Sequence, residues 1–476
     1  MSKYLIFRSL TAAALTLVTI CALSACGKSN TYGEGDESEF SLSSLQIIPS
    51  ETDGADLPAS GGVTQVFTVL REASAEPGFA PSGLDEDIFS KTVYERNSKI
   101  YDEYGIEIKE IVTDDILRYA KTEELSESTD YDMLVFSAAG SSSELMSGGY
   151  LCDLLTLPGF NASAKGYYTS AMSSLSLAGR VYLAAGDAVP SFIRSTSAVL
   201  IDTAMFSKIG SAEEVSLLAA SGGFTYEAMQ KYSKQYAALV GETDASFAIS
   251  VAADDAYSLF LSSGGSFMLK DALSDMPISP EFGEDMSKIY KNICNLIGFD
   301  PDLSEAALAE SLESTAEDTE IPDSTEKDSP LFRACDVSSF EMLRQEEAPF
   351  IILPMPKFSA SDERYVCNVN LDTAALTALP AGGKNNENAL SVMNLIYATS
   401  GNIAASIGGE STGFELVKGS TFGDLLSAFG YADIKGLMAS SVSDKMPTSD
   451  FLPEAAKRSK AAVAALSIVA EKLVRG

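Results

Sequence analysis

Short apolar segments alternate with helical stretches between residues 63 and 136, and this alternation constrains the fold more than any other feature. Residues 63–70, 106–112 and 131–136 have the apolar, β-branched character of strands, and the last is a short continuous run typical of a strand buried on both faces. Between the first two, apolar residues recur with helical spacing up to Gly105, which ends the predicted helix. Strands separated by helices of about 10–20 residues indicate an α/β lobe with a parallel sheet.

The chain loses this regular alternation after Gly148 and Gly149. We predict strands at 180–185, 198–201, 349–356 and 371–380, and helices near 226–240, 254–262, 284–296, 387–400 and 454–474. Residues 300–330 are strongly acidic and read as a solvated surface insertion, because the spacing of acidic residues and glycine that defines a calcium loop is missing.

The first 26 residues have the organisation of a secretory signal. Lys3 and Arg8 form a basic start, residues 10–23 are almost continuously apolar, and Ala25 precedes Cys26. The apolar run is shorter than the roughly 20 residues of a membrane span. Leu-Ser-Ala before Cys26 resembles a bacterial lipobox, which implies that Cys26 carries lipid and holds the protein on the extracytoplasmic face of the cell membrane. An ordinary signal peptide or an uncleaved anchor is the alternative.

A chain of 476 residues is long enough for two lobes. We expect a signal peptide at 1–25 and a flexible linker at 26–62, where Ser, Gly and acidic residues dominate. The first lobe is expected at 63–190 plus about 376–430, and the second at 191–375 plus about 431–476.

Composition excludes several functions. The formal net charge of −34 excludes nucleic-acid binding through bulk electrostatics. The chain has no histidine, which excludes Ser-His-Asp catalysis and His-ligated zinc, and no tryptophan. The cysteines outside the signal are widely spaced, so we expect neither metal nor cofactor, and the pairing of Cys152, Cys294, Cys335 and Cys367 stays open.

Several segments, in order, resemble the extracellular solute-binding proteins of family 1, the sugar-type receptors of ABC importers. They are the lipobox, Tyr131-Asp132-Met133-Leu134-Val135 leading to Leu151-Cys152-Asp153-Leu154, residues 177–187 (LAGRVYLAAGD), residues 198–210 (AVLIDTAMFSKIG), Gly222-Gly223-Phe224-Thr225-Tyr226, and residues 353–358 (LPMPKF) with Tyr365. The resemblance covers about 63–400.

The resemblance implies a type II periplasmic-binding-protein-like fold, with two α/β lobes and a ligand cleft between them. It also implies a monomer that performs no catalysis, binds a small solute, expected to be a carbohydrate, and delivers it to ABC permease subunits. The only membrane contact is then the N-terminal lipid. Ligands of open α/β sheets bind outside the carboxyl ends of the strands, which agrees with this arrangement.

Eight residues are candidates for ligand contact, and each has a structural alternative. Tyr167 and Tyr168 can stack on a sugar or pack in the core. Asp187 can accept hydrogen bonds from hydroxyl groups or form a turn. Arg194 can donate to ligand oxygens or form an ion pair.

The remaining candidates lie later in the chain. Gly264 and Gly265 permit close backbone approach to a ligand or end a helix. Tyr257 faces the cleft or the core, and Asn370 flanks the returning segment.

Two other functions are compatible with the sequence. A secreted glycoside hydrolase can work with two carboxylates and no histidine. A surface lipoprotein whose pocket has diverged can serve adhesion or sensing. The ordered motifs oppose the hydrolase, whereas the missing tryptophans and the polar Asp202 keep the diverged lipoprotein open.

Overall fold

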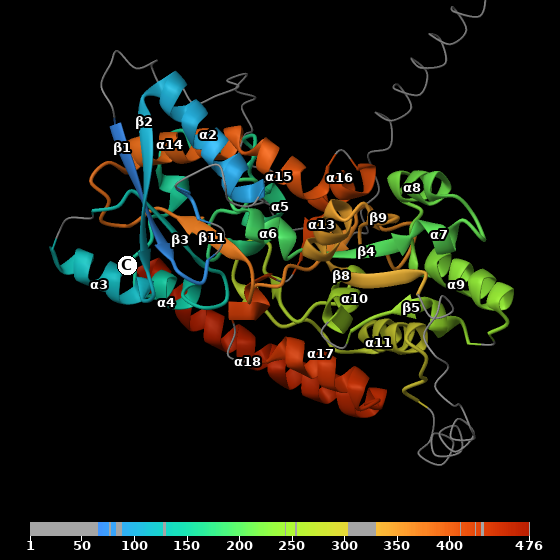
Figure 1. The fold of residues 1–476 in the computed structure, drawn as a ribbon. Coiled ribbons are helices and arrows are strands. Elements are labelled where there is room, and N and C mark those ends of the chain that lie inside the picture. Colours follow the sequence, from blue (N-terminus) through green and yellow to red (C-terminus); the bar gives the residue numbers. More distant parts are fainter. Residues whose placement is uncertain are drawn as a thin grey trace, which may run out of the picture. The chain divides into compact units, whose positions relative to one another are not determined.

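A computed structural model describes most of the chain after the N-terminal region (Figure 1). The described residues are 65–75, 78–81, 88–126, 130–242, 244–252, 255–302, 330–409, 411–423, 425–429 and 433–475. The signal peptide, Cys26, the linker at 26–62 and most of the acidic insertion at 300–330 lie outside them. Those predictions therefore remain untested.

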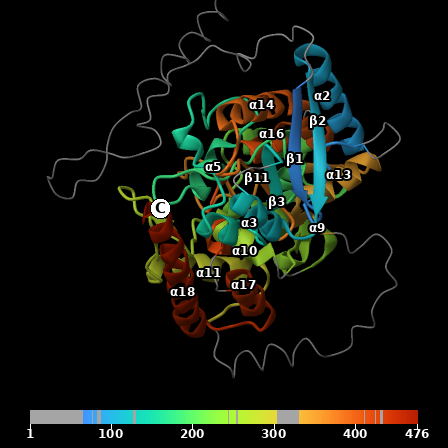
Figure 2. The ribbon, with the colours of Figure 1, turned by 90° about the vertical axis from the view of Figure 1, so that its left-hand side faces the viewer.

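The first sheet contains the strands predicted from the alternating pattern. Its strand order is β11-β3-β1-β2, and it is formed by β1 (Gln65–Glu72), β2 (Ile106–Thr113), β3 (Met133–Ser137) and β11 (Ala375–Ala378). β1 pairs in parallel with β2 and β3, whereas β11 pairs antiparallel with β3. β1 and β2 lie side by side in both views (Figures 1 and 2). The carboxyl ends of the three parallel strands therefore meet at one edge.

Helices cover this sheet as right-handed crossovers require. α2 (Ile88–Tyr104) links β1 to β2 and packs against α14 (Asn386–Thr399). α3 (Ile116–Ser126) links β2 to β3 in the opposite direction and packs against α4 (Ser142–Ser147). Crossovers that run in opposite directions along a sheet lie on opposite faces.

The second sheet is mixed. Its order is β5-β8-β4-β9, formed by β5 (Ile249–Ser250), β8 (Phe332–Asp336), β4 (Ser197–Asp202) and β9 (Phe350–Leu353). β4 is antiparallel to both β8 and β9, and all six of its residues are buried. The strands predicted at 198–201 and 349–356 are confirmed. The predicted strand at 180–185 is wrong, since its residues form only isolated bridges, Arg180 with Leu177 and Ala184 with Thr377.

The remaining elements surround these sheets. The helices of the middle region are α5 (Thr169–Leu175), α6 (Pro190–Arg194), α7 (Thr203–Phe206), α8 (Ala212–Ala220), α9 (Tyr226–Val240), α10 (Ala256–Ser262), α11 (Glu284–Leu296) and α13 (Val337–Gln345). Those of the C-terminal region are α15 (Gly401–Gly408), α16 (Thr412–Lys418), α17 (Ile434–Ser443) and α18 (Thr448–Arg475). The short 3-10 helices are η1 (Leu154–Thr156), η2 (Ala245–Ala248) and η4 (Leu425–Phe429). Two further strand pairs are β6 (Leu269–Lys270) with β7 (Pro277–Ile278), and β10 (Val366–Cys367) with β12 (Thr421–Phe422).

Two chain segments run side by side between the sheets. The first leaves α6 and enters β4, and the second follows β10 and enters β11. The backbone N–H of Ser197 donates to the carbonyl oxygen of Asn368 at 2.8 Å, and Thr196 and Val369 form an antiparallel bridge between them. Paired crossing segments of this kind are where hinge closure bends a chain.

Apolar packing is continuous between the two sheets. One buried cluster contains Leu70 and Phe136 from the first sheet and Val199 from the second. The rings of Phe192 and Phe422, whose centroids are 5.4 Å apart, lie within this cluster.

The C-terminal region contacts both sheets. α15 packs against α2, which covers the first sheet. α16 packs against β9 of the second sheet and against α8. The division of residues 376–430 and 431–476 between two lobes therefore stays a prediction.

Candidate functional site

The candidate site begins with two carboxylates at the carboxyl ends of β8 and β5. These strands are parallel, so their ends meet at one edge of the second sheet, where Asp336 ends β8 and Asp255 follows β5 before α10. The pKa of Asp336 is raised to about 6, first by burial and then by the charge of Asp255, while Lys435 and a hydrogen bond from Asn370 oppose the rise. The two carboxylates are thus close enough to affect one another's ionisation.

Asn370 connects this pair to the crossing segment. Its side-chain oxygen accepts a hydrogen bond from Lys435 Nζ at 3.3 Å, and Lys435 also lies 3.8 Å from the carboxylate of Asp372. The backbone N–H of Asn370 donates to the carbonyl oxygen of Ser195. The carboxylates of Asp255 and Asp336, the Asn370 amide and the Lys435 ammonium group thus form one connected set.

The first sheet contributes a third carboxylate at its own strand ends. Glu72, at the end of β1, accepts hydrogen bonds from the backbone N–H of Ser137 at 2.8 Å and from Ser141 Oγ at 3.0 Å. The loop after β3 reaches the crossing segment, because the N–H of Ala139 donates to the carbonyl oxygen of Leu371 at 3.1 Å. The strand ends of both sheets thus lie next to the segment that carries Asn370.

This arrangement is suited to binding hydroxyl groups. Ionised carboxylates only accept hydrogen bonds, an ammonium group only donates, and an amide does both. A polyhydroxyl solute both donates and accepts, so it can satisfy all three. Among the described residues, no group of three or more Cys, Asp or Glu side chains is placed to hold a metal ion.

Of the residues predicted from the sequence, Tyr257 and Asn370 are the nearest to this set. Tyr257 lies in the first turn of α10, two positions after Asp255, and α10 packs against α17, which carries Lys435. Its side chain is buried, and its ring centroid lies 5.9 Å from that of Phe267. The contacts of Tyr257 shown here are therefore core contacts.

Arg194 lies beside the site and is held by two partners. Its Nε donates to Glu341 at 2.9 Å, and its guanidinium lies 4.8 Å from the centroid of the Phe89 ring. Glu341 is buried on α13, the helix that follows Asp336. Arg194 thus joins α2 of the first sheet to α13 of the second.

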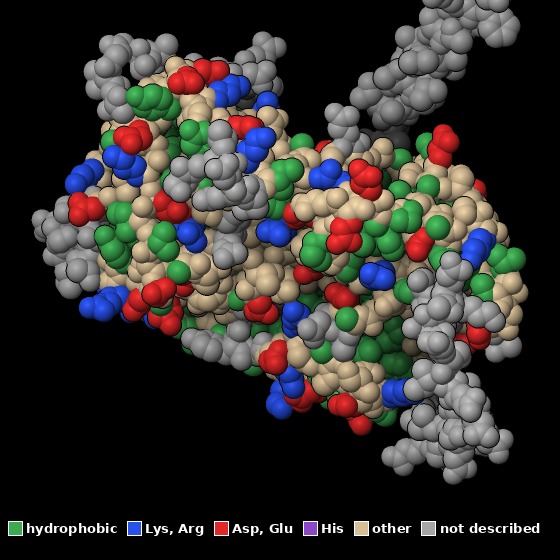
Figure 3. Space-filling model, viewed as in Figure 1, with side chains coloured by type: hydrophobic (Ala, Val, Ile, Leu, Met, Phe, Trp, Pro, Cys, Tyr) green, Lys and Arg blue, Asp and Glu red, His purple; other side chains and the backbone are tan. Residues whose placement is uncertain are grey.

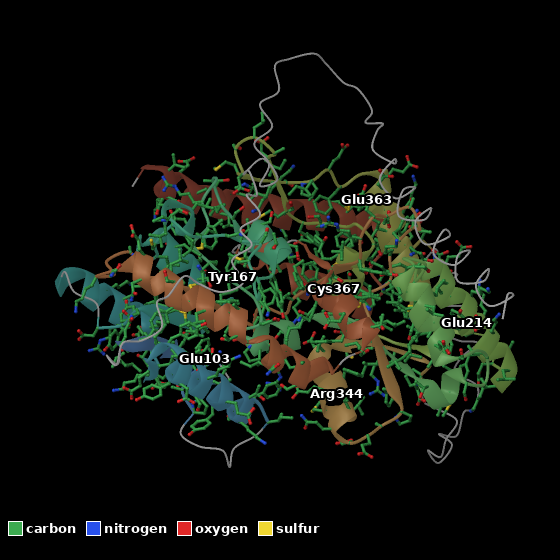
Figure 4. The ribbon with its side chains drawn as sticks, turned by 90° about the horizontal axis from the view of Figure 1, so that it is seen from above. Glu103, Tyr167, Glu214, Arg344, Glu363 and Cys367 are labelled. Carbon is green, nitrogen blue, oxygen red and sulfur yellow. The ribbon has the colours of Figure 1, made fainter. Side chains whose placement is uncertain are left out.

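Tyr167 and Tyr168 lie elsewhere, in the core. Tyr167 stacks on Tyr397 with ring centroids 4.1 Å apart and donates to Asn394, both on α14 (Figure 4). Tyr168 OH donates to Asp187 at 2.8 Å. Burial raises the pKa of both tyrosines well above the usual value.

Asp187 is also buried, and it forms an ion pair with Lys418 at 3.4 Å. Tyr167 thus contacts α14, and Asp187 joins Tyr168 to Lys418 at the end of α16. Ligand contact by Tyr167, Tyr168 and Asp187 stays a prediction that the observed core contacts do not support.

Gly264 and Gly265 follow the C-terminal end of α10, at the opposite end from Asp255. Gly264 has a φ of +83° and no atom within 4 Å of where its Cβ would be, whereas a Cβ on Gly265 would lie 2.6 Å from the Phe260 ring. Gly265 is thus required by packing. At the helical rise per residue, they lie roughly 14 Å along α10 from Asp255.

Sequence reasoning missed Glu72, Asp255, Asp336 and Lys435. The strand ending in Asp336 follows directly after the acidic insertion and was not predicted. Its carboxylate could therefore not be placed at the end of a strand. Glu72 lies two residues beyond the end predicted for the first strand. A search for acidic residues at the carboxyl ends of strands finds both.

The surface shows no gathering of one charge on the face seen in Figure 3. Among the described side chains there, Lys and Arg are interspersed with Asp and Glu. No described helix is long and apolar enough to span a membrane.

Comparison with solved structures confirms the predicted fold. A cyclo/maltodextrin-binding protein complexed with maltotetraose matches with a TM-score of 0.52 and 10% identity, over 84% of this chain and 98% of that one. The cyclic α-maltosyl-1,6-maltose binding protein of Arthrobacter globiformis matches with a TM-score of 0.53 and 10% identity, over 85% of this chain and 100% of that one. The resemblance to sugar-type receptors expected from the sequence thus holds at the level of the fold.

Sequence comparisons add nothing to this. No protein-family model matches the chain. No curated protein matches it by sequence.

Proposed function

We propose that this protein is an extracytoplasmic substrate-binding lipoprotein of an ABC importer, which captures a small carbohydrate by closure of two lobes. The observation that carries the proposal is the position of Glu72, Asp255 and Asp336 at strand ends of two sheets that a paired crossing segment joins. Proteins of this fold named for binding maltodextrins and cyclic maltosyl-maltose support it. The protein would perform no catalysis.

The ligand would lie against the crossing segment. Carboxylates from the second sheet and Glu72 would accept hydrogen bonds from hydroxyl groups, while Lys435 and the Asn370 amide would donate to ring or hydroxyl oxygens. A ligand that touches both sheets stabilises the closed form because only that form offers all the contacts. Asn370 and Tyr257 are the predicted residues nearest to this position.

Lipid attachment is the second part of the proposal. It rests on Cys26 behind Leu-Ser-Ala and the basic, apolar start of the chain. Expression with an alkyne-labelled palmitate should label the protein, and C26A should abolish both labelling and membrane fractionation. Unchanged labelling of C26A would contradict it.

Binding is tested by thermal unfolding with a panel of mono- and oligosaccharides. A bound ligand raises the midpoint by the mass-action term. We expect at least one sugar to do so, and D336N with D255N to lose the effect.

One observation favours a glycoside hydrolase as a second candidate. Asp255 lies beside Asp336, whose pKa is raised, and a pair of neighbouring carboxylates of which one has a raised pKa can serve as acid and base. Release of shorter products from oligosaccharides, lost in D336N, would select this function over binding.

A further inference from the structure

A separate cavity lies between α9, η2 and α11, on elements that do not carry the carboxylate pair. Its volume is about 410 Å³. It includes Ile249, at the amino end of β5, whereas Asp255 follows the carboxyl end of that strand. This volume is within the roughly 300–1,000 Å³ range of small-molecule sites.

Two helices present three amide side chains and one lysine to this cavity. Gln230 and Lys234 are four residues apart on α9 and lie on one face of it. Asn292 and Asn295 are three residues apart on α11 and lie on one face of that helix. Within the described part of the chain, these four side chains make no hydrogen bond or ion pair. Their polar groups are therefore available to a ligand.

The third element that lines the cavity, η2, is held in place by local hydrogen bonding. Asp244 caps η2 by accepting from the backbone N–H of Ser246 at 2.9 Å. Gly298 has a φ of +93°, and a Cβ there would lie only 2.6 Å from Ser246 Oγ. The chain after α11 thus packs directly on η2, which fixes Ser246 and Asp244 at the edge of the cavity.

The chemistry of the lining selects a class of ligand. One lysine and one aspartate balance each other, so the cavity has no excess charge for a phosphate or a polyamine. No aromatic side chain is among its described lining residues, which disfavours a nucleobase. Three amides, each of which donates and accepts, match hydroxyl groups, which do the same.

We propose that this amide-lined cavity, formed by Gln230, Lys234, Asn292 and Asn295 with η2, is a second binding site for a neutral polyhydroxyl ligand, either a free sugar or polyol or the end of a glycan. It is independent of the carboxylate pair. It does not require the proposed importer function, because it belongs to one side of the second sheet alone.

The test uses saturation-transfer NMR on purified protein carrying D336N and D255N, which disable the strand-end site. The probes are D-glucose, xylitol and maltotetraose at millimolar concentration. We expect saturation transfer to at least one probe, weakened about tenfold in affinity by N292A with Q230A, since two hydrogen bonds are lost. Asn388 is a half-buried amide on α14 that does not line this cavity, so N388A is the matched control and should bind as its parent does.

The probes distinguish the source of the ligand. Equal binding of D-glucose and maltotetraose indicates a free sugar site, stronger binding of maltotetraose indicates a glycan end, and preference for xylitol indicates a polyol. If the double alanine variant does not fold, the nearly isosteric N292L provides the readout, because it removes both the donor and the acceptor of the amide. Equal saturation transfer in the parent and in N292L or the alanine variant, or none to any probe in the parent, would overturn the proposal.

Discussion

The backbone N–H of Asn370 donates a hydrogen bond to the carbonyl oxygen of Ser195 at 2.8 Å. Ser195 belongs to the segment that enters β4, and Asn370 to the segment that returns to β11, so this bond ties both crossings together. The Asn370 side chain contacts Lys435 on α17 and Asp336 at the end of β8. One residue thus belongs to the crossing pair and to the candidate site, which under the proposed function would link ligand contact to lobe closure.

Asp336 should make stability depend on pH. Its pKa is about 6 in the folded protein against 3.8 as its ordinary value, so the folded state binds more protons between these values. The free energy of unfolding should therefore fall as pH rises from about 4 to 6 and stay low above that. At about 1.4 kcal/mol per pKa unit, reduced because the site is partly exposed, D336N should be more stable at pH 7 by about 1–2 kcal/mol and unchanged at pH 4. Urea unfolding at both pH values measures this, and equal gains at pH 4 and 7 would contradict it.

Asp187 should be a stability residue. D187A removes the acceptor of Tyr168 OH and the partner of Lys418 in a buried setting. Leaving these groups unpaired should cost about 2–4 kcal/mol in urea unfolding. Glu103→Ala breaks the exposed Lys99–Glu103 pair and should leave the midpoint unchanged (Figure 4). A D187A protein that is as stable as wild type but has lost sugar binding would instead support the ligand role predicted from the sequence.

Gly413 should be required where α16 meets β9. A Cβ at this position would lie 1.7 Å from the carbonyl oxygen of Ile352. G413A should therefore lower stability by at least about 2 kcal/mol, since α16 or β9 has to move. The control is G401A in α15, where a Cβ meets no atom within 4 Å and should be neutral or slightly stabilising. Similar melting midpoints for the two variants would show that α16 does not pack on β9 in this way.

The four described cysteines should react slowly in the folded protein. All four are free thiols, and burial raises the pKa of Cys294 and of Cys335 to about 12. Iodoacetamide at pH 8 should label Cys152, which is only partly buried, before Cys294 and Cys367. Mass spectrometry of tryptic peptides gives the order. A disulfide between any two of them would contradict the structure.

The first sheet could be predicted because its signals are local. The buried run at 131–136 and the glycine that ends α2 each indicate one element, and right-handed crossovers leave few ways to assemble them. The second sheet was harder, because β5 has two residues and β8 follows the acidic insertion. Residues 180–185 have strand-like composition but form only isolated bridges at Arg180 and Ala184, so tertiary contacts outweigh the local pattern.

The site was less predictable than the fold for a physical reason. Whether a tyrosine faces a ligand or the core depends on what packs beside it, and Tyr167 meets Tyr397, which is 230 residues later in the chain. Lys435 reaches the site from α17, in a region that no motif marked. The topology of the fold brings such residues together, and their spacing along the sequence does not reveal which ones will meet.

Titration calorimetry of the protein with maltotetraose and a panel of smaller sugars measures whether the strand-end carboxylates bind carbohydrate. We expect at least one sugar to bind, and we expect D336N with D255N to weaken its affinity at least about tenfold, while Glu103→Ala does not. Binding that is unaffected by the double carboxylate variant, or no binding of any sugar to a folded protein, would contradict it.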